Sequence, residues 1–87
     1  MSISRVAEKQ VRKLPPHIQE ALWYWVNAVE FLGIKEVRRF PGYHDEPLKG
    51  ERKGQRSIRL NRAYRALYIE TNADVEILII EVNKHEY

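Results

Sequence analysis

The chain has 87 residues, of which 44% are hydrophobic and 31% charged, and a formal net charge of +3 at pH 7. This length predicts one domain, residues 1–87, and the absence of cysteine excludes thiol catalysis and cysteine-ligated metals and fits a reducing cytosol. No apolar run approaches the roughly 20 residues of a membrane span and the N-terminus lacks a signal-peptide core, so we expect a soluble cytoplasmic protein without membrane contact.

The first predicted element is a helix over residues 5–13. Ser4 is a suitable N-cap for it, because a serine side chain can accept a hydrogen bond from the first helical turn. Its apolar face is expected to hold Val6, Val11 and Leu14. Ahead of it, residues 1–3 are interpreted as the remnant of a short N-terminal strand that pairs with a sheet edge.

A second helix is predicted over residues 16–32. Proline is tolerated in a first helical turn, so Pro15-Pro16 can end one helix and begin the next. Gly33 is the expected residue just after the helix end. The apolar side chains of this segment recur at helical spacing; they are Ile18, Leu22, Trp25, Val26, Val29 and Leu32. The two helices together predict a helical hairpin.

The second half of the chain predicts a sheet. Residues 34–40 are expected to add a short helical turn, and residues 41–54, with two prolines and three of the four glycines, are typical of a loop. Alternation then predicts three strands, over residues 57–60, 64–70 and 75–82, and the apolar run ILII places the last strand at the centre of the sheet. The fold class is therefore α+β, with the helical hairpin packed on one face of a small, mainly antiparallel sheet.

Positive charge is concentrated in the middle third of the chain. Residues 35–65 hold 10 Lys and Arg against 4 Asp and Glu, residues 1–34 hold 4 against 3, and residues 66–87 hold 1 against 5. Such a cluster is expected of a phosphate-binding surface. From charge alone, a solvated surface is an equally good explanation.

Within this region, Arg59 and Arg65 are predicted to lie on the same face of the sheet, across a tight turn at residues 61–63. The other face, toward the hairpin, would hold Ile58, Leu60, Ala66 and Tyr68. Two like charges on adjacent strands destabilise each other unless an anion or solvent intervenes, and arginine suits bidentate phosphate binding. The alternative is that these arginines pair with Glu70, Glu76 or Glu81.

Few other side chains could take part in chemistry. His85 and Tyr87 follow the last strand, and His44, Asp45 and Glu46 lie in the loop. Taken alone, His85 is best explained as a tail residue and Asp45-Glu46 as a turn before Pro47. The sequence has no HExxH, P-loop or GxGxxG motif, so neither a metal nor a cofactor is expected.

Four segments follow the helical hairpin in order. They are E-P-L-K-G at 46–50, G-x-x-S-I-R-L at 54–60, Y-R-A-L-Y at 64–68 and K-H-E-Y at 84–87. This order resembles the RelE/ParE toxin superfamily of bacterial toxin–antitoxin systems, and most closely its RelE-, YoeB- and HigB-like mRNA interferases. The resemblance covers nearly the whole chain and implies a RelE-like fold.

The resemblance also implies a catalytic set. Arg65 and Arg59 would contact the scissile phosphate, Glu46 would be the general base, His85 the general acid, and Tyr87 would stack on a base. Because Glu86 separates His85 from Tyr87, Glu86 is an alternative for the position given to His85. The expected phosphate or RNA contacts are Lys49, Arg52, Lys53, Arg56, Arg62 and Lys84.

The function implied is that of a type II toxin, a ribosome-dependent endoribonuclease that inhibits translation by metal-independent cleavage of mRNA. The implied partners are the ribosome, mRNA and a cognate antitoxin, a small helix-turn-helix or ribbon-helix-helix protein. Two alternatives stay open. One is a ParE-like inhibitor of DNA gyrase that acts by protein contact, and the other is a catalytically degenerate member that only binds its antitoxin or nucleic acid.

Overall fold

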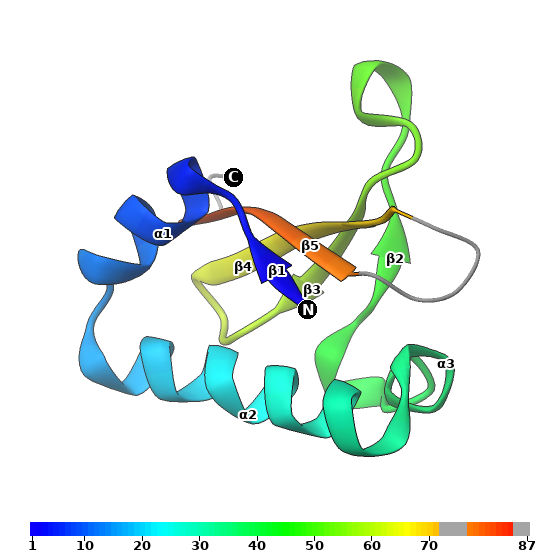
Figure 1. Ribbon diagram of the computed structural model, residues 1–87, viewed down its shortest axis with the longest axis horizontal. Coiled ribbons are helices and arrows are strands. Elements are labelled where there is room, and N and C mark those ends of the chain that lie inside the picture. The colour runs from blue at the N-terminus through cyan, green and yellow to red at the C-terminus, as the bar shows by residue number, and fades with distance from the viewer. Residues whose placement is uncertain (72–76, 85–87) are drawn as a thin grey trace.

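The computed structural model describes residues 1–71 and 77–84, which form helices packed against one mixed sheet (Figure 1). The helices are α1 (Arg5–Arg12), α2 (Pro16–Leu32) and α3 (Ile34–Val37), with 3-10 turns η1 (Pro41–Tyr43) and η2 (Gly50–Arg52). The strands are β1 (Ser2–Ile3), β2 (Glu46–Pro47), β3 (Arg56–Arg59), β4 (Tyr64–Glu70) and β5 (Ile77–Lys84). The predicted α+β class, with a hairpin of α1 and α2 on a mainly antiparallel sheet, is confirmed.

Helix α1 is capped by Ser4, as predicted. The Ser4 Oγ accepts a hydrogen bond from the Ala7 N–H at 3.0 Å and donates one to the Ile80 carbonyl at 2.9 Å. Its buried face differs from the prediction, because Ala7 and not Val6 packs inward, and Val6 is 56% exposed. Ala7, Val11 and Leu14 lie at i, i+4 and i+7, the spacing of one helical face, whereas Val6 lies one residue off it.

Helix α2 has the predicted bounds, and Gly33 follows it with a φ of 87°, a value that favours glycine. The prediction that Leu32 belongs to the buried stripe is wrong, since Leu32 is 45% exposed. The chain turns at Gly33, and the next two core positions are taken by Ile34 and Val37 of α3.

The sheet has the strand order β1-β5-β4-β3-β2, and all its neighbours are antiparallel except β1 and β5. The expected N-terminal strand is confirmed, because Ser2 pairs with Leu78 and Ile3 with Ile79. The prediction that the last strand is central is wrong, since β4 holds that place. The apolar run of β5 is explained by its neighbours: β1 pairs with Leu78 and Ile79 on its outer edge, and Gln10 of α1 accepts a hydrogen bond from the Val82 N–H at 2.7 Å.

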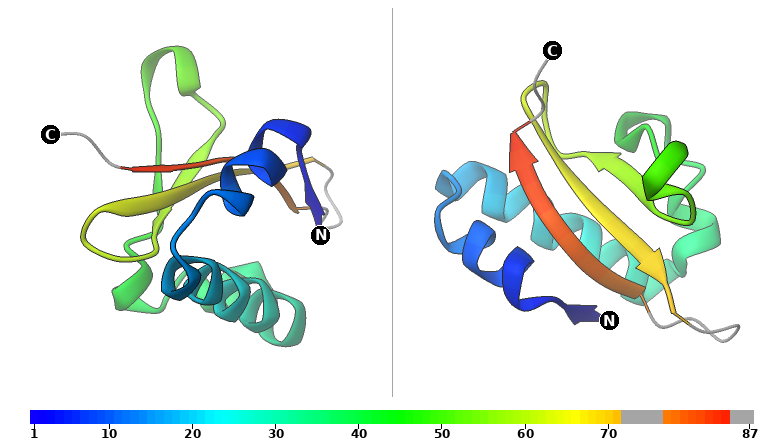
Figure 2. Two further views of the ribbon diagram at one scale, coloured as in Figure 1. Left: turned by 90° about the vertical axis from the view of Figure 1, so that its left-hand side faces the viewer. Right: turned by 90° about the horizontal axis from the view of Figure 1, so that it is seen from above.

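The core lies between the sheet and α2, which the right panel of Figure 2 shows behind the sheet. Ile58, Ala66 and Tyr68 are buried on this side, as predicted, and the Tyr68 and Trp25 rings lie 5.2 Å apart. Leu60 is only partly buried at the margin of the core. We call the opposite side of the sheet, which carries Arg59 and Arg65, the distal face.

The segment predicted as a loop contains the edge strand β2 and a buried carboxylate just before it. The Asp45 side chain is 1% exposed and accepts hydrogen bonds from Arg56 Nε at 2.6 Å and Tyr68 Oη at 2.5 Å, with Arg38 Nε at 3.8 Å. Arg38 also donates to Tyr68 Oη and forms an ion pair with Glu70. This cluster joins the end of α3 to the loop, β3 and β4, so that it fixes where β2 lies.

Replacing Asp45 is therefore expected to destabilise the fold. In Asp45→Ala, Arg56 and the buried phenol of Tyr68 lose their acceptor and Arg38 loses an ion-pair partner. We expect the free energy of unfolding to fall by about 3 kcal/mol, the lower end for a broken buried ion pair, because the arginine side chains keep some contact with water. Urea denaturation measures the loss. Glu8→Ala, which removes an exposed i,i+4 pair with Arg12, is the control and should change stability by less than about 0.5 kcal/mol. Equal losses in the two variants would contradict the role given to Asp45.

The same cluster predicts a loss of stability in alkali. Burial, and then the hydrogen bond to Asp45, raise the pKa of Tyr68 above its ordinary value of about 10. Above that pH the unfolded chain loses the tyrosine proton while the folded chain keeps it, so stability should fall as pH rises. Urea denaturation of wild type between about pH 9 and about pH 11 should show this slope. Tyr68→Phe should reduce it, and Tyr24→Phe, which changes an exposed ring, should retain it.

Candidate functional site

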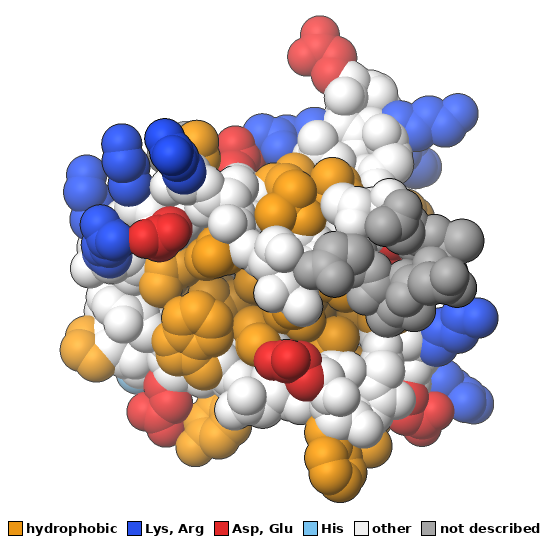
Figure 3. Space-filling model, in the orientation of Figure 1, with side chains coloured by type: hydrophobic (Ala, Val, Ile, Leu, Met, Phe, Trp, Pro, Cys, Tyr) orange, Lys and Arg blue, Asp and Glu red, His pale blue; other side chains and the backbone are white. Residues whose placement is uncertain are grey.

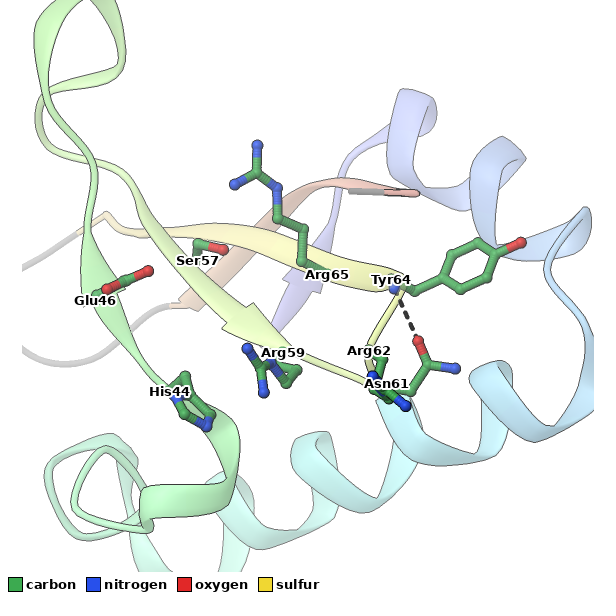
Figure 4. A pocket seen from close by; sticks show the side chains of 8 residues that line it. All are labelled: His44, Glu46, Ser57, Arg59, Asn61, Arg62, Tyr64 and Arg65. Carbon is green, nitrogen blue, oxygen red and sulfur yellow. Dashed lines mark hydrogen bonds between the residues drawn. The ribbon is translucent and has the colours of Figure 1, made fainter. Parts of the chain in front are cut away.

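A pocket of about 170 Å³ opens on the distal face between β2, β3 and the β3–β4 turn. Figure 4 shows the residues that line it: His44, Glu46, Ser57, Arg59, Asn61, Arg62, Tyr64 and Arg65. The Tyr64 ring points away from the others, toward the core. The pocket therefore brings together four of the residues predicted for catalysis or RNA contact, namely Glu46, Arg59, Arg62 and Arg65.

Arg59 and Arg65 lie directly opposite each other on β3 and β4, which confirms their predicted placement on one face. The turn between them is set by Asn61, whose Oδ1 accepts hydrogen bonds from the backbone N–H groups of Ala63 and Tyr64, both at 2.8 Å. An asparagine that accepts from the backbone two or three residues on is a common way to stabilise a tight connection. It aligns the two strands so that Arg59 and Arg65 pair in register.

Neither arginine has a hydrogen-bond or ion-pair partner within residues 1–71 and 77–84. The predicted alternative, pairing with strand carboxylates, is wrong for Glu70, which pairs with Arg38, and for Glu81, which pairs with Arg52 at 3.0 Å. Glu76 lies outside the described residues. The Nε of Arg65 is buried without a partner in this part of the chain. Two guanidinium groups thus face one pocket with no described carboxylate bound to either.

Glu46 reaches the pocket from β2. It lies opposite Ser57, so it shares the distal face with Arg59, which is two residues further along β3. Diagonal neighbours on adjacent strands have side chains about 7–8 Å apart, within reach of a molecule held between them. The pocket can therefore present one carboxylate and two guanidinium groups to the same ligand.

Three of the other predicted RNA contacts lie outside the pocket, on one loop. Lys49, Arg52 and Lys53 belong to residues 48–55, which we call the basic arm and which projects from the sheet (Figure 1). The hydrogen bond from Leu48 N–H to the Gln55 carbonyl, at 2.9 Å, closes the base of this arm. Arg52 also contacts Glu81 and Gln55 within the fold.

Two predicted contacts lie on the hairpin side of the sheet. Arg56 turns there to bind Asp45, and Lys84 pairs in register with Tyr64, so it does not share the face of Arg59 and Arg65. His85, Tyr87 and the alternative Glu86 lie outside the described residues. Sequence reasoning named His44 only as chemically capable and did not place it in the pocket; no periodic signal marked it, because it precedes a two-residue strand.

The described residues contain no group of three His, Asp or Glu side chains arranged to hold a metal ion. Within the same residues, no helix has the length and apolar character needed to cross a bilayer.

Neither a protein-family model nor a curated protein matches this sequence. Several solved structures match in fold. The YoeB/ParE toxin from Agrobacterium tumefaciens has a TM-score of 0.73 at 17% identity, with 99% of this chain and 100% of that chain covered. The YoeB-YefM complex from Staphylococcus aureus has a TM-score of 0.74 at 19% identity, covering 99% and 94%.

A third match is the toxin–antitoxin complex RelBE2 from Mycobacterium tuberculosis, with a TM-score of 0.65 at 25% identity over 95% of this chain and 93% of that chain. All three structures are of toxins, alone or with an antitoxin, and they share this arrangement of helices and sheet over almost their whole length. The chain therefore has the fold of the RelE/ParE toxin superfamily, as its sequence motifs indicated.

Proposed function

We propose that this protein is the toxin of a type II toxin–antitoxin system and that it cleaves mRNA on the ribosome, in the cytoplasm, as a metal-independent endoribonuclease. The observation that carries the proposal is the pair Arg59 and Arg65, which has no partner among the described residues and lines a pocket that also holds Glu46. Like charges held opposite each other cost stability unless an anion lies between them. A phosphodiester is the anion that best fits such a site, since guanidinium groups bind phosphate oxygens in bidentate fashion.

The proposed reaction is transfer of the phosphate from the 5′-oxygen to the neighbouring 2′-oxygen. The Glu46 carboxylate takes the proton of the ribose 2′-OH, and the 2′-oxygen attacks phosphorus. The bond to the 5′-oxygen then breaks, and His85 donates a proton to that oxygen. The products are a 2′,3′-cyclic phosphate and a free 5′-OH, while Glu46 gains and His85 loses one proton. Proton transfer of this kind contributes about 10²–10⁴-fold to rate.

The arginines act on the charge that builds up on the phosphate as the 2′-oxygen attacks. Donors already aimed at that charge are usually the largest single contribution to catalysis. Arg65 lies on the central strand and its Nε is buried, so the part of its side chain nearest the backbone is enclosed by the fold before substrate arrives. Lys49, at the base of the basic arm, would add a further phosphate contact, and Tyr87 would stack on a base.

The ribosome is proposed to present the mRNA and to bind the basic residues around the pocket. Lys53 on the basic arm and Arg62 in the β3–β4 turn are both exposed, and Arg62 lines the pocket. Contacts of this kind with RNA phosphates weaken steeply as salt rises, because counterions are released on binding.

The proposed antitoxin has two surfaces to cover. An acidic segment would complement the distal face, and the hairpin offers an apolar groove of about 90 Å³ beside β1. Its lining residues are Met1, Ser2, Ile3, Trp23, Val26, Glu30 and Ile79. Figure 3 shows hydrophobic side chains gathered on this side of the molecule, between α1 and α2. Trp23 is exposed in the groove, as is common for aromatic contacts in interfaces.

Substitution of Arg65 tests the proposed activity. In a translation extract programmed with a defined mRNA and read by primer extension, wild-type protein should produce in-frame cuts. Arg65→Ala should reduce them by at least about 10²-fold, the usual effect of removing one donor to a charged transition state. Arg39→Ala is the matched control, because Arg39 is an exposed arginine paired only with Glu36 in the described structure, and its cuts should equal those of wild type.

The outcome also separates the alternatives that share this fold. If wild-type protein makes no cuts, or if Arg65→Ala cuts as well as wild type, the nuclease proposal is wrong. Inhibition of gyrase in a supercoiling assay that survives Arg65→Ala would then favour the ParE-like function. A protein that neither cleaves nor inhibits gyrase, and whose induction does not slow growth, would be the degenerate member.

A further inference from the structure

His44 is a pocket residue with no part in the reaction proposed above. It lies in the loop between η1 and β2 and lines the same pocket as Glu46, Arg59 and Arg65 (Figure 4). The structure explains why it points there. Asp45 is turned inward and held by Arg56 and Tyr68, while the residues on either side of it, His44 and Glu46, both line the pocket. Burial of the Asp45 side chain therefore directs the neighbouring side chains of His44 and Glu46 toward the same pocket.

The backbone of His44 is also fixed. Its φ of 46° and ψ of 47° make it the one non-glycine residue with a positive φ in the described chain, and its N–H bonds to the Pro41 carbonyl at 3.2 Å to close η1. A left-handed conformation costs a non-glycine residue about 1 kcal/mol or more. Such conformations persist where the surrounding structure enforces them, and they cluster at functional sites.

The charges that line the pocket around His44 come from four parts of the chain. Glu46 of β2 is negative, and Arg59 of β3, Arg62 of the turn and Arg65 of β4 are positive. Together these groups give the pocket a net positive charge, which favours an anionic ligand. A phosphate bound beside His44 favours the protonated form of the imidazole, because the anion compensates the added positive charge.

We propose that His44 is a proton-dependent ligand of the RNA backbone, whose protonated ring donates a hydrogen bond to a phosphodiester oxygen held by Arg59 and Arg65. The inference rests on the proposed function for its class of ligand. Histidine changes its charge between about pH 5 and about pH 8, so RNA binding takes up a proton and weakens as pH rises through that range. Phosphodiesters keep one charge throughout it, so the dependence comes from the protein.

The test is the affinity of a short 2′-O-methylated oligoribonucleotide, which cannot be cleaved because its 2′-oxygens are blocked. Between about pH 5.5 and about pH 8, wild-type protein should lose about tenfold in affinity, the usual size for one charge-assisted hydrogen bond. His44→Asn should bind equally at both pH values and match wild type near pH 8. Asparagine tolerates the left-handed backbone, so the variant keeps the loop conformation. His17→Asn, an exposed histidine at the start of α2, is the control and should behave as wild type.

Each other outcome overturns the inference. If His44→Asn keeps the pH dependence, the titrating group is elsewhere, and loss of the dependence in His85→Asn would identify it. Binding by wild type that does not change with pH, or no binding at all, would equally exclude the role given to His44. Failure of the nuclease proposal alone would give a different result. Wild-type protein would then make no mRNA cuts on the ribosome but would still bind RNA with a pH dependence that His44→Asn abolishes. The nuclease activity would be excluded, and the role of His44 as a ligand would be retained.

Discussion

The buried carboxylate of Asp45 is the interaction on which the geometry of the site depends. It accepts hydrogen bonds from β3 and β4, through Arg56 and Tyr68, and it lies next to Arg38 at the end of α3. A carboxylate this deeply buried is stable only while its partners stay in place, so the loop cannot move independently of the sheet. For that reason Glu46 and His44, on either side of it, are held at the pocket that Arg59 and Arg65 share.

The arginines of the sheet region divide into two sets by their partners. Arg38, Arg52 and Arg56 bind carboxylates and hold loops to the sheet. Arg59 and Arg65 have no such partner among the described residues, although they lie opposite each other. The first set stabilises the fold, and the second carries a repulsion that only a bound anion or solvent relieves. Sites that bind charged substrates commonly give up stability in this way.

Much of this could be predicted from sequence because it depends on neighbours in the chain. The bounds of α2 follow from prolines, a glycine and a helical stripe, and the placement of Arg59 opposite Arg65 follows from alternation across a short turn. The Asp45 cluster could not be predicted, since Asp45 and Tyr68 are 23 positions apart and meet only when the sheet has closed. Strand β2 is too short to give a periodic pattern, so the place of His44 just before it was not visible, and Glu46 of β2 was assigned to the site only through the family resemblance.

The division between the two sets of arginines is tested most directly by stability measurements at low and high salt. Arg59→Gln removes one side of an unrelieved repulsion, so in urea denaturation at low salt the variant should be more stable than wild type by about 0.2–1 kcal/mol, and the difference should shrink at high salt. Arg52→Gln, which removes the partner of Glu81, should instead be no more stable than wild type. An Arg59→Gln protein that is less stable than wild type at low salt would show that Arg59 has a partner within the fold and would contradict the account.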